Sequence, residues 1–263
     1  MNRNLLHLLS EPGALTCRFQ PIVYASDPGK IHAVESLTRG PKGTLFESPQ
    51  VLFDYVRRKR AEVSIERECV QNIFADAQVF PASLPFSINI HASTLTRDRD
   101  FAAMLQRRAE VTGVALSRLI VEIVEHAPAW NQPAFLAALK ALRAIGIRIA
   151  LDDIGLGNSN YRMVLDAQPE YFKMDAYICR GAHADAARRA VVRSVVQLAR
   201  DLGGATVAEG IEVTPDFETM VDLGVDYIQG YLFHKPMHSS EIAALMPVPK
   251  LPVASREWQM ETA

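Results

Sequence analysis

The sequence predicts an α/β protein built as a (β/α)8, TIM-like barrel with an antiparallel first strand. Short apolar segments alternate with helices of ten or more residues, which is typical of βα units around a parallel sheet. About eight such units fit in the 263 residues, the usual size of this barrel. The first two strands are joined by a short turn, so they should be antiparallel. An open, doubly wound sheet is the alternative.

The N-terminal half begins with a predicted hairpin around the turn signal Asp27-Pro28-Gly29. Apolar residues at helical or strand spacing then mark the elements that follow. In order, the expected elements are the strands Leu15–Tyr24 and Ile31–Arg39, the helices Pro49–Lys59 and Val63–Phe80, the strand Phe86–Ile90, the helix Phe101–Thr112 and the strand Leu119–Glu125.

The C-terminal half continues the alternation. Gly146 and Gly203 follow two helical patterns, where glycine favours a helix end. The expected elements are helix Gln132–Ile145, strand Arg148–Leu151, a weaker strand Tyr171–Met174, helix Ala186–Leu202, strand Ala205–Ala208, helix Pro215–Leu223, strand Asp226–Ile228 and helix Ser239–Leu245. Residues 1–246 should form one domain. The segment Pro247–Ala263 has three prolines and no helical period, so we expect a flexible tail.

Composition excludes several classes of protein. With 28 basic and 30 acidic residues the net charge is −2, unlike the basic balance typical of a polymeric nucleic-acid binder. No apolar run approaches the ~18 residues of a membrane span. The three cysteines, Cys17, Cys69 and Cys179, form no CxxC pair, which favours a reducing compartment. We therefore expect a cytoplasmic protein with no membrane partner. The basic run Arg57–Arg60 is expected to be the solvated end of a helix.

Polar side chains stand at or near the carboxyl ends of seven predicted strands. Those ends share one rim of a barrel, where barrel enzymes build their active sites. Singly, each residue has an ordinary explanation as a helix cap, a satisfied core amide or a surface lysine. Together these explanations fail, because charges inside apolar strands are costly to bury. The residues are Glu35, Asn89, Glu122 with Glu125, Asp152 with Asp153, Lys173, Glu209 and Gln229.

The carboxylates among them indicate a metal site. Five carboxylates on one rim would repel each other and take up protons unless cations neutralise them. Oxygen ligands suit a hard divalent ion such as Mg²⁺ or Mn²⁺. Such a site binds phosphate, and with two ions it activates water for attack on a phosphodiester. The five are Glu35, Glu122, Asp152, Asp153 and Glu209.

The order of the motifs carries a family resemblance. From residue 19 to residue 237 the chain reads FQPIV, ESLTR, INI, VEIVE, ALDDIGLG, FKMD, AEGIE and QGYLFHKP. This order resembles a stand-alone EAL domain. The resemblance implies a barrel with an antiparallel first strand, and hydrolysis of cyclic di-GMP to linear pGpG with Mg²⁺ or Mn²⁺, two ions per site.

The resemblance also implies roles for individual residues. The first metal would be held by Glu35, Asn89, Glu122 and Asp152, and the second by Asp153 with Asp152 bridging. Lys173 would position the attacking water, Glu209 would act as general base or as a partner of the water, and Glu125 would anchor the loop after Asp153. The substrate would be surrounded by Gln20, Leu37, Arg39, Glu212 and Gln229, with the forked guanidinium of Arg39 aimed at a phosphate.

Three departures from the family pattern leave every implied metal ligand in place. Ser36 replaces the signature alanine, and Val124 replaces a common threonine. The loop that commonly reads DDFGTGYSS is DDIGLGNSN at Asp152–Asn160. In the family this loop couples the metal site to dimerisation. We expect a homodimer through this loop and the helix beyond it, with Ile154 and Leu156 supplying apolar area.

Two other functions remain as alternatives. The first is a catalytically weak EAL module that acts as a cyclic di-GMP receptor or regulates a protein partner. The second is some other barrel metallohydrolase. The retained carboxylates and Lys173 favour hydrolysis. His91, two residues past Asn89, is either a packed histidine or a neighbour of the site.

Overall fold

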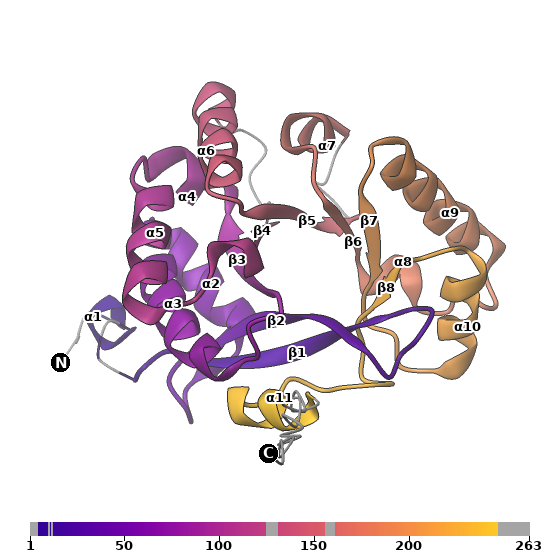
Figure 1. Ribbon diagram of the computed structural model, residues 1–263, viewed down its shortest axis with the longest axis horizontal. Coiled ribbons are helices and arrows are strands. Elements are labelled where there is room, and N and C mark those ends of the chain that lie inside the picture. Colours follow the sequence, from indigo (N-terminus) through magenta and orange to yellow (C-terminus); the bar gives the residue numbers. More distant parts are fainter. Residues whose placement is uncertain (1–4, 10, 12, 125–130, 156–160, 247–263) are drawn as a thin grey trace, which may run out of the picture.

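The computed structural model describes residues 5–9, 11, 13–124, 131–155 and 161–246. Its eight strands form one closed barrel in sequence order (Figure 1). The first strand, β1, is antiparallel to both its neighbours, and the other neighbouring pairs are parallel. The predicted barrel and its antiparallel first strand are confirmed, and an open sheet is excluded. The strands are β1 Thr16–Tyr24, β2 Ile31–Arg39, β3 Phe86–His91, β4 Leu119–Val124, β5 Arg148–Ile154, β6 Tyr171–Met174, β7 Ala205–Ala208 and β8 Tyr227–Ile228.

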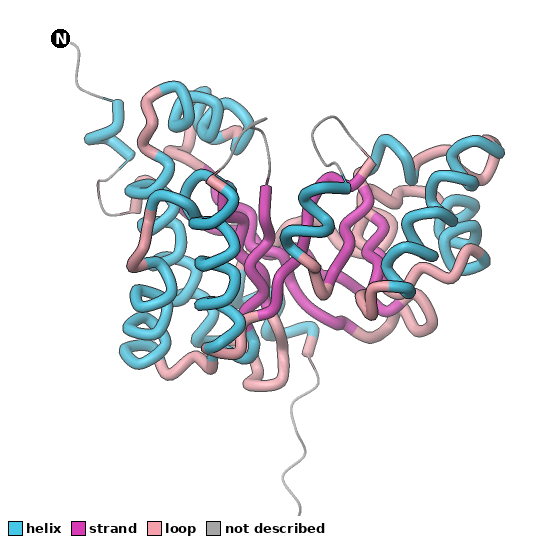
Figure 2. The backbone as a smooth tube through the Cα atoms, turned by 90° about the horizontal axis from the view of Figure 1, so that it is seen from above, coloured by secondary structure: helices cyan, strands magenta, loops and turns pink. Residues whose placement is uncertain are grey.

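Helices surround the barrel. In Figure 1, α2 to α5 lie on one side and α9 and α10 on the other, while α11 lies beside β1. Figure 2 shows the strands between these two groups. The helices are α1 Leu5–Leu9, α2 Pro49–Arg58, α3 Glu62–Asp76, α4 Ala92–Arg97, α5 Phe101–Thr112, α6 Gln132–Ala144, α7 Tyr161–Ala167, α8 Ala176–Cys179, α9 Ala186–Asp201, α10 Thr214–Asp222 and α11 Ser239–Leu245. Three-residue 3-10 turns are η1 Leu45–Glu47, η2 Ala77–Val79 and η3 Leu116–Arg118.

The core has an outer layer and an inner layer, and β4 contributes to both. Val121 and Ile123 belong to the layer between the strands and the helices. Ile120 belongs to a small apolar cluster inside the barrel, and Glu122 follows it two residues later. Successive strand residues point to opposite faces, so Ile120 and Glu122 share the inner face. Apolar side chains therefore fill the lower interior and leave the carboxyl ends of the strands for polar groups.

Several elements differ from the sequence prediction. The predicted helix Val63–Phe80 is α-helical only to Asp76, and its last turn is the 3-10 turn η2. The strand predicted to end at Leu151 continues to Ile154. The structure also has the short helices α1, α4, α7 and α8, which the sequence does not predict, because runs of four to seven residues seldom show a clear helical period. The predicted tail Pro247–Ala263 lies outside the described residues.

The three cysteines are free and buried. No described helix is long and apolar enough to cross a membrane.

Candidate active site

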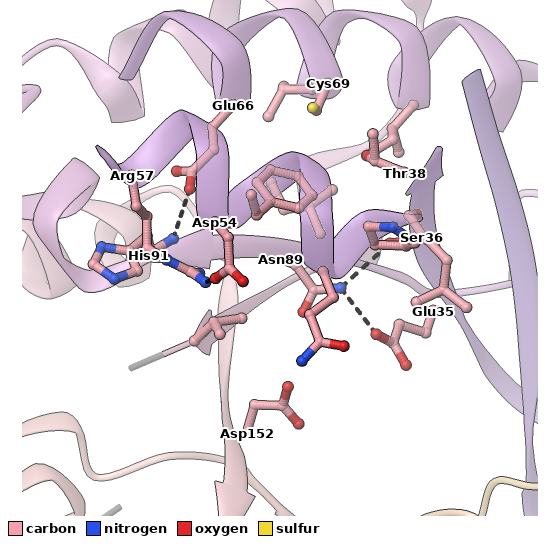
Figure 3. Close-up of a pocket in the computed structure, with 18 residues that line it drawn as sticks. Glu35, Ser36, Thr38, Asp54, Arg57, Glu66, Cys69, Asn89, His91 and Asp152 are labelled. Atoms are coloured by element: carbon pink, nitrogen blue, oxygen red, sulfur yellow. Dashed lines mark hydrogen bonds and ion pairs between the residues drawn. The ribbon is translucent and has the colours of Figure 1, made fainter. Parts of the chain in front are cut away.

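The predicted polar side chains meet at the carboxyl-terminal rim of the barrel. The register between β3 and β4 brings two of these side chains together, because Asn89 of β3 lies opposite Glu122 of β4. The close-up in Figure 3 places Asn89 between Glu35 and Asp152. Direct contacts, described below, join Glu35, Glu122, Asp152, Glu209 and Gln229 to one another or to Lys173. The rim predicted from the sequence is therefore one cluster of interacting groups.

A bulge in β5 accounts for two adjacent aspartates at this rim. Leu151 pairs with Phe172, but the next pair joins Ile154 to Met174, so β5 carries one extra residue. Asp153 has a φ of 55°, in the left-handed region that non-glycine residues seldom adopt. A regular strand would send neighbouring side chains to opposite faces, and a bulge changes that direction. Asp152 and Asp153 consequently belong to one carboxylate group with Glu209.

The ammonium group of Lys173 lies at the centre of the carboxylates. Its Nζ is 2.6 Å from Glu209 Oε1, 3.2 Å from Asp152 Oδ1 and 3.3 Å from Glu35 Oε2. It also forms an ion pair with Glu122 Oε1. The lysine side chain is only 3% exposed, so this charge is taken out of water and balanced by the site itself.

Burial and the neighbouring charges together shift the pKa values of these groups. Burial raises the pKa of Asp152 well above its ordinary value, and the charges of Glu209 and Asp153 add to the rise. Burial also raises the pKa of Glu209, because Lys173 offsets only part of that effect. Burial alone would lower the pKa of Lys173, but Glu209 and Glu35 raise it. The site therefore holds more negative charge than one lysine neutralises.

Glu35 differs from Asp152 and Glu209 because its pKa is lowered. Its burial would raise its pKa, but Lys173, Asn89 and Gln229 together lower it. Asn89 Nδ2 donates to Glu35 Oε1 at 2.9 Å, and Gln229 Nε2 donates to Oε2 at 2.7 Å. Gln229 Nε2 also lies 3.3 Å from Gln20 Oε1. These amides hold an ionised Glu35 in one orientation.

Close packing of a glycine positions Gln229. Gly230 follows it, and a Cβ at Gly230 would lie 1.9 Å from the carbonyl oxygen of Ile211. Only glycine lets the chain after β8 approach Ile211 this closely. The Gln229 backbone N–H donates to Ala208 O and its carbonyl accepts from Ile211 N–H. These bonds fix the backbone of Gln229, from which its side chain reaches Glu35.

The sequence prediction missed Ser87. Its Oγ donates to Glu122 Oε2 at 2.6 Å, and both residues are buried. Ser87 stands two residues before Asn89 in β3, so the two share the inner face. This spacing is the signal that could have identified it.

The carboxylates form two groups that could each hold a cation. Ligand oxygens of Glu35, Glu122 and Glu209 lie within 4.8 Å of one another, and so do those of Asp152, Asp153 and Glu209. Glu209 is common to both groups, whereas the sequence prediction gave the shared position to Asp152. The donor set is acidic and consists of oxygens, and burial with mutual repulsion raises the pKa values of Asp152, Asp153 and Glu209. Such a set fits a hard divalent ion, because the ion would relieve that repulsion.

A cavity of about 470 Å³ opens beside these groups, between β2, β3 and the helices α2 and α3. Glu35, Leu37, Asn89 and Asp152 line it at the rim. Farther in, Glu66 accepts a hydrogen bond from His91 N–H at 3.1 Å (Figure 3). Burial raises the pKa of Glu66 to about 8.

His91 is both a packed, buried histidine and a neighbour of the site. Its Nδ1 accepts a hydrogen bond from Ser93 N–H at the start of α4, and the residue lines the cavity. Arg57 also reaches this cavity and pairs with Asp54, while Arg58, Lys59 and Arg60 are exposed. The solvated basic run is thus confirmed for three of its four residues.

Five of the predicted residues either lie apart from the cluster or fall outside the described residues. Arg39 ends β2 and its guanidinium donates to the neighbouring carbonyl of Thr38 at 3.3 Å. Glu212 is 43% exposed and pairs with Arg180 at 2.6 Å. Ile154 is buried, so the idea that it supplies exposed apolar area is wrong. Glu125 and Leu156 lie outside the described residues.

Comparisons with known proteins agree with this geometry. The family model "EAL domain" matches residues 2–236. The chain is 32% identical over 120 residues to "Cyclic di-GMP phosphodiesterase PdeL" of Escherichia coli, which covers 46% of this chain and 33% of the relative. It is 26% identical over 248 residues to "Probable cyclic di-GMP phosphodiesterase PdeG" of the same species, covering 92% and 48%. The chain spans less than half the length of these two relatives.

A solved structure is similar in both fold and sequence. The calcium and cyclic di-GMP complex of Klebsiella pneumoniae BlrP1 has a TM-score of 0.78 and 28% identity, covering 89% of this chain and 58% of that one. A stand-alone EAL protein of Vibrio cholerae in its c-di-GMP-bound form has a TM-score of 0.76 and covers 86% and 93%. Its 24% identity supports the fold alone.

Proposed function

The chain belongs to the EAL domain family, and we propose that it hydrolyses cyclic di-GMP to linear pGpG with Mg²⁺ or Mn²⁺ and so lowers the level of this bacterial second messenger. The observation that carries the proposal is the set of buried carboxylates gathered around Lys173 at the barrel rim. Relatives and structural neighbours named for the same nucleotide support it.

The two carboxylate groups are the proposed metal-binding residues. Glu35 and Glu122, with Asn89, would serve one ion, Asp152 and Asp153 the other, and Glu209 lies within reach of both sets. Divalent ions there supply Lewis acidity for attack of water on a phosphodiester. The negative charge that Lys173 leaves uncompensated is the feature that would attract them.

The protein's own groups would orient the reactants. Glu209 is the proposed acceptor of the water proton, since its carboxylate is largely buried and held by Lys173. Lys173 would hold the water and stabilise charge on the phosphate. Gln229 would keep Glu35 in place through its hydrogen bond to Oε2, and Gln20 contacts Gln229 in turn. Arg39 and Glu212, both at the edge of the rim, would contact the nucleotide, and Glu125 is proposed to anchor the loop after Asp153.

A homodimer and a cytoplasmic location complete the proposal. On α7, the helix beyond the loop 152–160, Tyr161 and Leu165 are 74% and 67% exposed. They are four residues apart and so share one helix face, which supplies the apolar area once assigned to Ile154. Three buried free thiols fit a reducing compartment.

The test is an assay of the purified chain with cyclic di-GMP in Mg²⁺, Mn²⁺, Ca²⁺ or chelator, with products separated by chromatography. Linear pGpG in Mg²⁺ or Mn²⁺, and none in chelator, supports hydrolysis. Nucleotide binding by calorimetry without any product in Mg²⁺ or Mn²⁺ would refute hydrolysis and favour the receptor function. If the protein neither binds nor hydrolyses cyclic di-GMP, both the phosphodiesterase and the receptor function are contradicted.

A further inference from the structure

Ser87 forms a buried hydrogen bond with a proposed metal ligand. Its hydroxyl donates to Glu122 Oε2 at 2.6 Å. Ser87 is 2% exposed and Glu122 is fully buried, so water does not compete for this contact. A hydrogen bond from a neutral hydroxyl to a charged carboxylate is stronger than one between neutral groups.

The two oxygens of Glu122 have different partners. Oε1 faces the ammonium of Lys173, whereas Oε2 faces Ser87. Among the described residues, Ser87 is the only one whose hydrogen bond reaches Oε2. Below this contact lies a small cavity of about 20 Å³, lined mainly by apolar side chains such as Ile22, Ile120 and Val207. Without the hydroxyl, Oε2 would be buried with no donor.

We propose that Ser87 is a positioning residue that sets the orientation of the Glu122 carboxylate and presents Oε1 to the cation. The inference rests on the proposed metal-dependent function. Groups that hydrogen-bond a metal ligand fix its orientation, and their removal typically weakens metal binding or activity by about 10–100-fold. The serine itself lies one layer below the rim and is not expected to touch substrate.

Calorimetric titration with Mn²⁺, without nucleotide, tests this positioning role. Ser87→Ala should bind Mn²⁺ about 10–100-fold more weakly than the wild type. Ser87→Thr retains the hydroxyl and should recover most of the affinity. Ser36→Ala is the matched control, because Ser36 is also a buried barrel serine but its Oγ makes no hydrogen bond to any described residue. Its affinity should equal that of the wild type.

Activity gives a second readout. If Ser87 acts only on metal binding, the turnover of Ser87→Ala should recover as Mn²⁺ is raised, with the nucleotide KM little changed. Should Ser87→Ala fail to fold, Ser87→Cys keeps the size and offers a weaker donor, and it should show a smaller loss in the same titration.

The outcomes separate the two proposals. Wild-type affinity in Ser87→Ala or in Ser87→Cys, or an equal loss in Ser36→Ala, would overturn the positioning role while leaving the metal site intact. Failure of the wild type itself to bind Mn²⁺ would instead contradict the proposed function.

Discussion

Replacing Lys173 with methionine should destabilise the metal-free protein strongly. Methionine keeps an unbranched side chain but removes the charge that contacts Glu35, Glu122, Asp152 and Glu209. Removing one partner of a buried ion pair costs about 3–5 kcal/mol, because the remaining charge is left uncompensated. For a chain of this size each kcal/mol lowers the melting temperature by about 2–4 °C, so the expected loss is about 6–20 °C.

The loss of stability in Lys173→Met should increase with pH. Asp152 and Glu209 have raised pKa values in the fold, caused first by burial, so the folded protein binds protons that the unfolded chain releases. Their contribution to stability therefore falls as pH rises above the ordinary carboxyl value of about 4. Without the ammonium of Lys173 this penalty grows. Lys173→Met should lose more stability at pH 8 than at pH 5.

The measurement is thermal unfolding in chelator, at both pH values, for the wild type, Lys173→Met and the exposed-lysine control Lys140→Met. Lys140 lies on the solvent side of α6, and its replacement should leave the melting temperature unchanged. Mn²⁺ should stabilise Lys173→Met more than the wild type, since the ion replaces the lost positive charge. Equal melting temperatures for wild type and Lys173→Met in chelator at pH 8 would refute the reasoning.

Three further predictions concern chemistry, binding and assembly. Glu209→Gln should slow turnover by about 10²–10⁴-fold while nucleotide affinity is kept, and an unchanged single-turnover rate would remove Glu209 from proton transfer. Arg39→Ala should weaken nucleotide binding by about 10–150-fold, the worth of a charged hydrogen bond, without changing Mn²⁺ affinity by calorimetry; equal nucleotide affinity would make Arg39 structural. Leu165→Glu should convert a dimer to a monomer in light scattering, and a monomeric wild type at micromolar concentration would contradict the dimer.

The sequence predicted most of the barrel because most strands are short, largely apolar segments and each long helix shows a clear period. Glu35, Glu122 and Lys173 could be placed for the same reason, since a charged residue inside an apolar strand stands out. The strand order then brings those residues to one rim. Barrel geometry converts a pattern along the chain into a cluster in space.

Other features depend on contacts that no local pattern records. The bulge that places Asp152 and Asp153 in one group requires the pairing of β5 with β6. Ser87 is an ordinary strand residue until its partner Glu122 is known, because the two are 35 positions apart. Glu212 follows a strand end as the other candidates do, but Arg180, on a segment next to it in space, pairs with it away from the cluster.

The most direct test of the central claim is the rate of pGpG formation by the wild type and by Glu35→Ala at saturating Mn²⁺. Glu35 contacts Lys173, Asn89 and Gln229, and its oxygen belongs to one of the two proposed metal groups. The account predicts linear product from the wild type, none in chelator, and none above background from a folded Glu35→Ala. Turnover at the wild-type rate by Glu35→Ala, or product that persists in chelator, would contradict it.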